Sequence, residues 1–401
     1  MLLNNFIINS IGVEEINKEK LYFTAEDLEN ILEGSILLAS GGGGAREDGR
    51  SLMKAILHEG KKVEYISPEQ VGDKEYMAVV GGIGAPEAVK EFGFGYSARR
   101  AFELLEKVSK AGVLQNAFSC ALSGETGAVS QFITMLVAVQ KNIPVVDGDG
   151  AGRAFPSLQM ATFASNPEEI PISPVVLVNS KRFGEGGTEI VIYQKNPSVV
   201  DEISRSIIES KEFNEIASFA CFTMNGKAMK KVIVRNTFTQ ARDVGKIIKE
   251  SQGASATDFL QKLEEKKQIK GYLLFKGTVT EVENKTSGGF DFGKVTIEKD
   301  EEEINVIHQN ENLSAFLVKD NKLKPLAFVP DLICYMELDG NKIKQPLSNV
   351  DIRKNKEVAL IGFRADEKLR CAYLLEAFTK ARGNLGDFYK YQRIEDLNKA
   401  D

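Results

Sequence analysis

Apolar positions in the first half of the chain alternate between helical spacing and short unbroken runs. Helical spacing, which predicts helices with one buried face, occurs in residues 28–36, 96–111 and 129–137. The unbroken runs, typical of buried strands, are residues 77–80, 117–122 and 143–146. Strands and helices that alternate at this spacing predict a parallel α/β sheet. We therefore expect residues 1–190 to form a mostly parallel α/β domain with Gly-rich loops at the strand ends.

The pattern changes near Gly271, where two-residue alternation replaces helical spacing. Short strand candidates separated by turn-forming residues then follow one another through residues 272–361. We expect residues 266–365 to form a β-rich domain and residues 366–401 to form a closing helix and tail. Residues 191–265 mix both patterns and are expected to be an α/β segment that connects the two domains.

Composition and charge exclude several classes of protein. With 401 residues, of which 43% are hydrophobic and 27% charged, the chain is expected to be globular with more than one domain. A net charge of −6 argues against nucleic-acid binding, and no apolar segment is long enough to span a membrane. Residues 1–20 lack the basic start and continuous apolar region of a signal peptide, so we expect a cytoplasmic protein.

Cysteine and histidine are too few and too scattered for a zinc site of the usual kind. The four cysteines lie far apart without a C-x-x-C pair, and only two histidines are present. The dispersed cysteines fit a reducing compartment. A metal cofactor in this chain would be a divalent cation held by carboxylates.

Glycines gather at two predicted element ends. The run of residues 41–44 exposes backbone N–H groups near a helix start, where they could hold an anion or a polar ring. No Gly-Lys-Ser/Thr follows, so the run is not a phosphate loop for nucleoside triphosphates, and a plain tight turn is the alternative. Gly82 and Gly84 follow a predicted strand, but the third glycine of a dinucleotide turn is absent, which favours a structural turn.

Two carboxylates and a guanidinium lie among small residues at another strand end, in the segment that contains Asp147, Asp149 and Arg153. The pair of aspartates could share a cation, bind ring N–H groups or supply a general base. A capped turn with an Asp–Arg ion pair is the alternative. Because successive residues of an extended chain point to opposite sides, we expect Asp149 to face a cleft and Asp147 to brace the turn.

Glu125 follows the second predicted strand and lies near the aspartates if the two strands are neighbours. A carboxylate that stabilises a helix N-terminus is the alternative. We expect the glycine run, Glu125 and residues 147–153 to converge on one cleft. Asn310 or Glu311 of the β-rich domain would cover it, because clefts between domains are frequent ligand sites.

Several of these segments match, in order, the signatures of a known protein family. The chain resembles the S-methyl-thiohydantoin desulfurase-like family, long catalogued without a function and associated with hydantoinases. The matching segments are residues 41–44, 82–86, 144–149, 152–156, 223–226, 287–290, 310–311 and 330–333. Glu125 also stands at the family's distance from Asp147. The chain departs from the family at Gly127, Ala128 and Ser130, where two glycines and an asparagine are usual, and at Ser157, where a glutamate is usual.

The resemblance implies an α/β domain joined to a β-rich domain of the swivelling type. It also implies a hydrolase that acts on a thiohydantoin, a hydantoin or a related cyclic amide, such as an S-alkyl thiohydantoin. In that reading, the residues of the site have distinct roles. Asp147 or Asp149 acts as base or cation ligand, Glu125 orients ring N–H groups, Arg153 holds a substrate carboxylate, and the ligand contacts are Gly42, Gly43, Gly44, Gly84, Asn310 and Glu311.

The departures from the family motivate an alternative of another class. The chain would then be a non-catalytic subunit or small-ligand-binding protein that accompanies a hydantoinase- or oxoprolinase-type enzyme. Under either hypothesis we expect a small-molecule ligand and a homo-oligomer.

Overall fold

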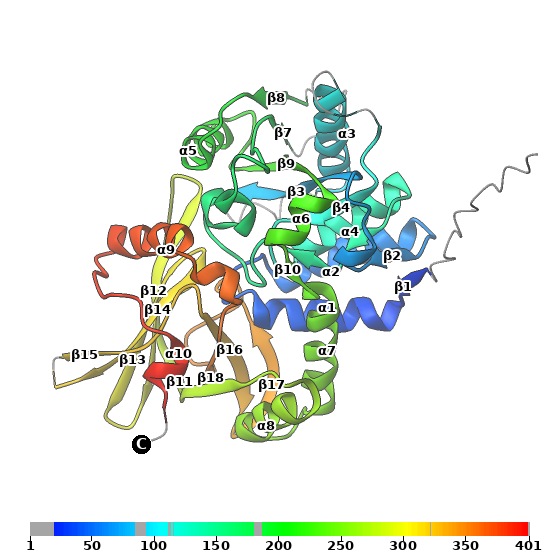
Figure 1. Cartoon of the computed structure of the whole chain (residues 1–401). Coiled ribbons are helices and arrows are strands. Elements are labelled where there is room, and N and C mark those ends of the chain that lie inside the picture. The colour runs from blue at the N-terminus through cyan, green and yellow to red at the C-terminus, as the bar shows by residue number, and fades with distance from the viewer. Residues whose placement is uncertain are drawn as a thin grey trace, which may run out of the picture.

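The computed structural model describes residues 20–84, 94–110, 114, 116–179, 187–320 and 322–399. Two eight-stranded sheets account for most of the strands in these residues, one built mainly from each half of the chain (Figure 1). A two-stranded pair, β6 (Gly148–Asp149) with β10 (Val234–Arg235), accompanies the first sheet. No described helix is long and apolar enough to cross a bilayer.

The first sheet is mixed rather than mostly parallel. Its strands, in spatial order, are β1 (Leu21–Phe23), β2 (Val63–Ile66), β5 (Val145–Val146), β4 (Cys120–Ser123), β3 (Tyr76–Gly84), β9 (Ile216–Asn225), β7 (Val175–Asn179) and β8 (Glu189–Ile192). The centre from β2 to β3 is parallel, as the alternation of strands and helices predicts. The pairs β1–β2, β3–β9, β9–β7 and β7–β8 are antiparallel. β9 comes from residues 191–265, so the expected connecting segment is part of this sheet.

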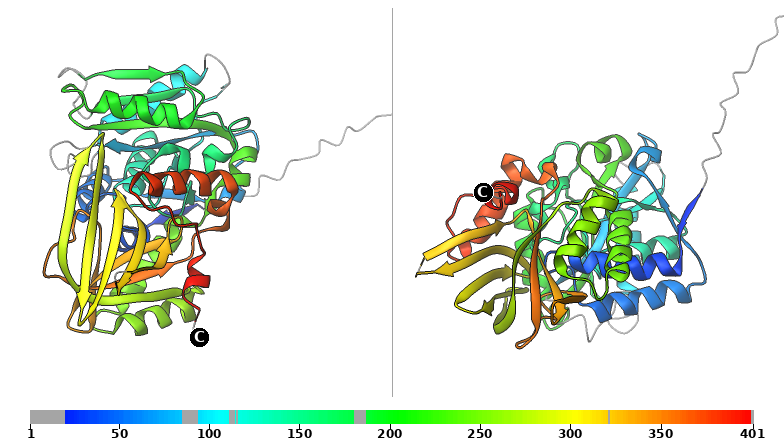
Figure 2. Two further views of the ribbon diagram at one scale, coloured as in Figure 1. Left: turned by 90° about the vertical axis from the view of Figure 1, so that its left-hand side faces the viewer. Right: turned by 90° about the horizontal axis from the view of Figure 1, so that it is seen from below.

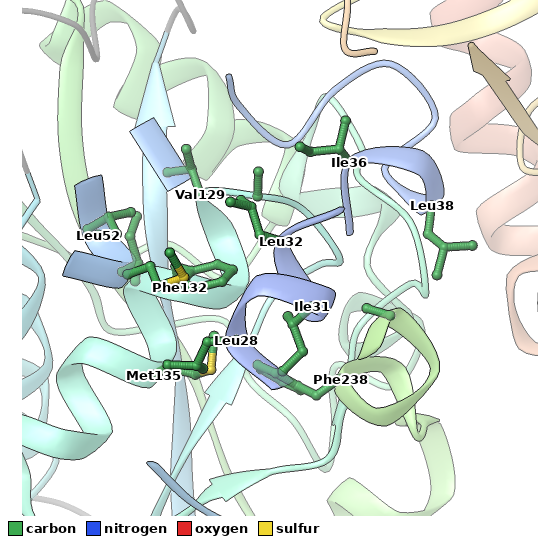
Figure 3. Packing of buried hydrophobic residues seen from close by; sticks show 14 of the residues in the cluster. Leu28, Ile31, Leu32, Ile36, Leu38, Leu52, Val129, Phe132, Met135 and Phe238 are labelled. Atoms are coloured by element: carbon green, nitrogen blue, oxygen red, sulfur yellow. The ribbon is translucent and has the colours of Figure 1, made fainter. Parts of the chain in front are cut away.

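Helices accompany the first sheet. They are α1 (Ala25–Leu38), α2 (Arg46–His58), α3 (Ser97–Lys110), α4 (Ser130–Lys141), α5 (Pro197–Ile208), α6 (Gly226–Val232) and α7 (Thr237–Glu250). Of these, α1 and α4 are buried over most of their length. Figure 3 shows Leu28 and Leu32 of α1 in one cluster with Phe132 and Met135 of α4. α1 and α7 lie side by side and approach closely at Gly34, where a Cβ would stand 1.8 Å from the carbonyl oxygen of Ala241.

The second sheet is antiparallel and curved like half of a barrel, and Figure 2 gives two further views of it. Its strands, in spatial order, are β15 (Lys322–Phe328), β14 (Glu311–Lys319), β13 (Glu302–Gln309), β12 (Phe290–Lys299), β11 (Gly271–Ser287), β18 (Glu357–Phe363), β16 (Leu332–Asp339) and β17 (Lys342–Leu347). The helices α8 (Ala256–Lys267), α9 (Ala372–Asn384) and α10 (Ile394–Leu397) accompany it. The prediction of a β-rich domain that begins near Gly271 is therefore confirmed.

The turn after α1 joins the two domains. Ser40 Oγ accepts a hydrogen bond of 2.8 Å from the backbone N–H of Ile333, and the carbonyl oxygen of Ser40 accepts one of 2.8 Å from Asn312. The carbonyl oxygen of Gly41 accepts a third, of 2.7 Å, from Asn349. Since all three donors belong to the second domain, this turn fixes the start of β14 beside the first sheet.

Candidate functional site

A cavity of about 110 Å³ lies at the carboxyl ends of β3 and β4. The first domain supplies most of its lining, including Gly81 to Gly84 of β3 and Glu125 just after β4. The second domain contributes Asn310 and Glu311. Strand carboxyl ends are where open α/β sheets bind ligands. Of the segments expected to converge on one cleft, the glycine run (through Gly43 and Gly44), Glu125 and Asn310–Glu311 line this cavity, whereas residues 147–153 do not.

Glu125 is held by two donors and keeps part of its surface open to the cavity. Its Oε1 accepts a hydrogen bond of 2.7 Å from Ser130 Oγ at the start of α4. Its Oε2 accepts one of 2.8 Å from the backbone N–H of Phe155. Burial nevertheless raises the pKa of Glu125 to about 7, and the nearby charge of Asp149 adds to the rise. Near neutral pH this carboxyl group can therefore both accept and release a proton.

Glu311 brings a second carboxyl group into the same cavity from the first residue of β14. It is 4% exposed, and its Oε2 has no hydrogen-bond partner within the described part of the chain. Burial raises its pKa well above the usual range, and the charge of Glu125 raises it further. Because two such groups cannot both ionise cheaply, the pair holds at least one proton at neutral pH.

The two aspartates brace the backbone and are not among the residues that line the cavity. Asp147 accepts hydrogen bonds at the start of α7, from the backbone N–H groups of Phe238 (3.0 Å) and Thr239 (3.2 Å) and from Thr239 Oγ1 (2.6 Å). Asp149 is fully buried. The role expected for Asp147 as a brace agrees with these contacts.

The expectation that Asp149 faces the cleft is corrected by the structure. Its Oδ1 accepts from the backbone N–H groups of Ala151 (2.8 Å) and Gly152 (2.6 Å), and its Oδ2 accepts from Thr126 Oγ1 (2.7 Å). The turn that follows Asp149 thus occupies Oδ1, and Thr126, just after β4, occupies Oδ2. The two aspartate side chains do point to different sides of the chain, as their alternation predicts, but both sides are buried in the protein.

Arg153 joins the two domains instead of facing the cavity. It is fully buried, and its Nε donates to the carbonyl oxygen of Ala154 at 2.8 Å. Its Nη1 donates to the carbonyl oxygens of Pro330 (3.0 Å) and Asp331 (2.9 Å), and its Nη2 donates to that of Asn312 (3.2 Å). These contacts replace both the substrate carboxylate and the Asp–Arg ion pair considered for it. Burial lowers the pKa of the guanidinium to about 10.

The donor set does not fit a divalent cation. Asp147 and Asp149 direct their oxygens at N–H and O–H donors, whereas a hard cation needs free carboxylate oxygens. In the residues that the structure describes, no group of three or more Asp, Glu, His or Cys side chains could hold a metal.

The glycine run shapes the cavity through close packing. Gly43 and Gly44 line it, and a Cβ on Gly44 would stand 2.3 Å from Cγ2 of Val129 at the start of α4. Gly42 lies behind Glu311, where a Cβ would stand 2.0 Å from Glu311 Oε1. Gly84 also lines the cavity, with a φ of 138°. Ala85 and Pro86, which complete this matching segment, lie outside the described residues.

Sequence reasoning missed two charged residues of α5 that also line the cavity, Asp201 and Arg205. Arg205 Nε donates to Asp201 Oδ2 at 3.1 Å, and the guanidinium stacks 3.4 Å from the centre of the Phe290 ring. The spacing of four residues on a helix was a signal, but the same spacing is typical of exposed ion pairs. Ser130 and Ser157, two of the departures from the family pattern, line the cavity as well.

Comparisons with known proteins cover nearly the whole chain. The model of the S-Me-THD-like N-terminal domain matches residues 26–189, and that of the S-Me-THD-like C-terminal domain matches residues 195–382. The crystal structure of a protein from Chromobacterium violaceum superposes with a TM-score of 0.79 at 26% identity, covering 94% of this chain and 100% of that one. Comparison with curated proteins gave no match. Since the two family models together span well over half of its length, the chain belongs to the S-Me-THD-like family.

Proposed function

We propose that this protein hydrolyses an S-alkyl thiohydantoin or a related cyclic amide, with Glu125 and Glu311 as its acid–base pair. The observation that carries the proposal is the meeting of two carboxyl groups of raised pKa, one from each domain, in a single cavity. Buried carboxyl groups with a raised pKa that meet in a cleft are typical of functional sites. Membership of the S-Me-THD-like family supports the choice of substrate class.

The hydrogen bonds of the two groups suggest a role for each. Glu125 accepts hydrogen bonds from Ser130 and from the backbone of Phe155, which stabilise its carboxylate form, so it serves as the base. Glu311 Oε2 has no such partner within the described residues and burial raises the pKa of this group, so Glu311 keeps its proton and serves as the acid. Water would add to the ring carbon that bears sulfur while Glu125 takes its proton. The carbon–sulfur bond would then break, and the sulfur would leave as a thiol with the proton of Glu311. The second proton of the water passes to the ring nitrogen as the carbonyl group forms, and the proton taken up by Glu125 replaces the one that Glu311 lost. Water and the S-alkyl ring thus give a hydantoin and a thiol.

The test uses the purified full chain with an S-methyl thiohydantoin, measuring thiol release with a thiol-reactive dye. We expect turnover by the parent and a loss of about 100-fold or more in kcat for Glu125→Gln and Glu311→Gln. Asp147→Asn is the control, because that side chain braces α7 away from the cavity and its loss should leave kcat largely intact.

Two results would contradict the proposal. Turnover that survives both glutamine substitutions would remove the carboxyl pair from the mechanism. Binding of the ring without turnover by the chain alone, with activity that appears only beside a hydantoinase-type enzyme, would favour a ligand-binding subunit.

A further inference from the structure

A single residue, Asn310, connects β13 to β14. Gln309 before it and Glu311 after it are paired with each other in the sheet. Asn310 has a φ of 56°, in the left-handed region that asparagine tolerates better than most residues. Backbone held in this region is frequent at catalytic and ligand-binding sites. Because Asn310 and Glu311 both line the cavity, this left-handed residue stands beside the proposed acid.

A backbone group orients the side-chain amide of Asn310. Its Oδ1 accepts a hydrogen bond of 2.8 Å from the N–H of Asp291, and the N–H of Asn310 donates one of 2.7 Å to the carbonyl oxygen of Asp291. Because a backbone N–H can only donate, the amide oxygen must face Asp291 and the NH2 group must point away from it. Nδ2 donates to no protein atom among the described residues. Two N–H donors of a residue that lines the cavity are thus left for a ligand.

The turn at Asn310 is held in place from both sides. Asn349 Nδ2 donates to the carbonyl oxygen of Asn310 at 2.8 Å, and Thr286 Oγ1 donates to Asp291 Oδ1 at 2.6 Å. The backbone N–H of Asn349 in turn donates to the carbonyl oxygen of Gly41 in the first domain at 2.7 Å. A donor fixed in this way needs no rearrangement when charge develops beside it, which is the property of an efficient electrostatic catalyst.

We propose that Asn310 is a catalytic residue that stabilises negative charge on the ring carbonyl oxygen of the substrate. The role rests on the proposed function, in which water adds to the ring carbon that bears sulfur. As the new carbon–oxygen bond forms, the electrons of the carbon–nitrogen double bond move onto the ring nitrogen, which shares them with the neighbouring carbonyl oxygen. Nδ2 of Asn310 donates a hydrogen bond to that oxygen. The charge disappears when the ring nitrogen takes the second proton of the water and the sulfur leaves with the proton of Glu311.

Two substitutions remove the donor in different ways. Asn310→Asp keeps the shape of the side chain and the acceptor that Asp291 uses, but it loses the NH2 group. Asn310→Gly tolerates the positive φ and adds no charge. With an S-methyl thiohydantoin and the thiol-reactive dye, we expect each full-length variant to lose about 100- to 1,000-fold in kcat. KM should change little, because the donor gains strength only as charge develops on the carbonyl oxygen.

Asn349→Ala is the matched control for the turn. It removes a hydrogen bond to the same residue, yet Asn349 lies outside the cavity lining and the amide of Asn310 remains. This variant should unfold at a lower urea concentration than the parent and keep kcat within a few-fold. Asn310→Gly should also keep the parent's pH profile of kcat, because both carboxyl groups of the cavity are still present.

Three results would overturn the role of Asn310 and leave the proposed function standing. They are a kcat within a few-fold of the parent in both Asn310 variants, an equal loss of kcat in Asn349→Ala, and a shifted pH profile in Asn310→Gly. The second would assign the effect to the shape of the turn, and the third to the carboxyl pair. If the glycine variant fails to fold, the aspartate variant decides. A parent that releases no thiol would contradict the proposed function itself, and the catalytic role of Asn310 with it.

Discussion

Replacing Glu125 by glutamine is expected to stabilise the protein at alkaline pH while removing the proposed activity. Burial raises the pKa of Glu125 from 4.5 to about 7, so the folded protein retains a proton that the unfolded chain releases. The free energy of unfolding therefore falls as the pH rises through this interval and levels off above it. One pKa unit corresponds to about 1.4 kcal/mol, which makes the total cost up to about 3 kcal/mol. Partial exposure to the cavity makes this an upper value.

A glutamine side chain at position 125 can keep both hydrogen bonds of Glu125 but carries no charge. Its Oε1 can accept the N–H of Phe155, while its Nε2 donates to Ser130 Oγ once that hydroxyl group has rotated. Urea unfolding of parent and variant at about pH 5 and about pH 8 measures the difference. We expect Glu125→Gln to gain up to about 3 kcal/mol on the parent between these two conditions.

Glu337 provides a control of opposite sign. Burial alone would raise the pKa of Glu337, but hydrogen bonds from Lys356 and Gln345 outweigh it and lower the pKa. Its charge therefore contributes stability that is present above its unfolded pKa and is lost as the pH falls through the folded value. Glu337→Gln should accordingly lose more stability at about pH 8 than at low pH. If the parent and Glu125→Gln showed parallel pH dependence, burial of Glu125 would not set its protonation and our reasoning would be refuted.

Three further substitutions test the architecture around the cavity. Asp147→Asn should cost about 1–3 kcal/mol in urea unfolding, because it weakens the accepted hydrogen bonds that begin α7. Arg153→Met should cost roughly 3–5 kcal/mol and make the link between the domains more sensitive to limited proteolysis, since buried carbonyl groups of the second domain lose their donor. Gly42→Ala should displace the Glu311 carboxyl group and abolish thiol release, whereas Gly95→Ala, with open space around its Cβ, should retain it in the same assay.

The sequence predicted the parts of the fold that depend on local patterning. Alternation beyond Gly271 indicated the second sheet, and the unbroken apolar runs indicated the parallel centre of the first. The antiparallel place of β9 could not be predicted, because its apolar residues satisfy either pairing and only the packed sheet selects the neighbours. Two of the four antiparallel pairs in the sheet, β3–β9 and β9–β7, follow from that strand.

The candidate site was predicted in position but not in detail. Glu125 and Glu311 were both named, yet their pairing depends on the turn at Ser40, which brings β14 beside the first sheet. The site role predicted for the two aspartates was wrong for a related reason. The donors that occupy Asp147 lie on α7, about ninety residues later in the chain, and no sequence spacing shows that they meet.

The place of β9 has a consequence for any attempt to divide this protein. β9 pairs with β3 on one side and with β7 on the other, although it follows the boundary between the two family models. A fragment ending after β8 would leave both of those strand edges open and prone to self-association. The complementary fragment would carry a mostly apolar strand without its sheet. Each piece should therefore be insoluble when produced alone, and co-expression should restore a soluble complex, so this boundary suits split-protein complementation rather than the exchange of independent modules.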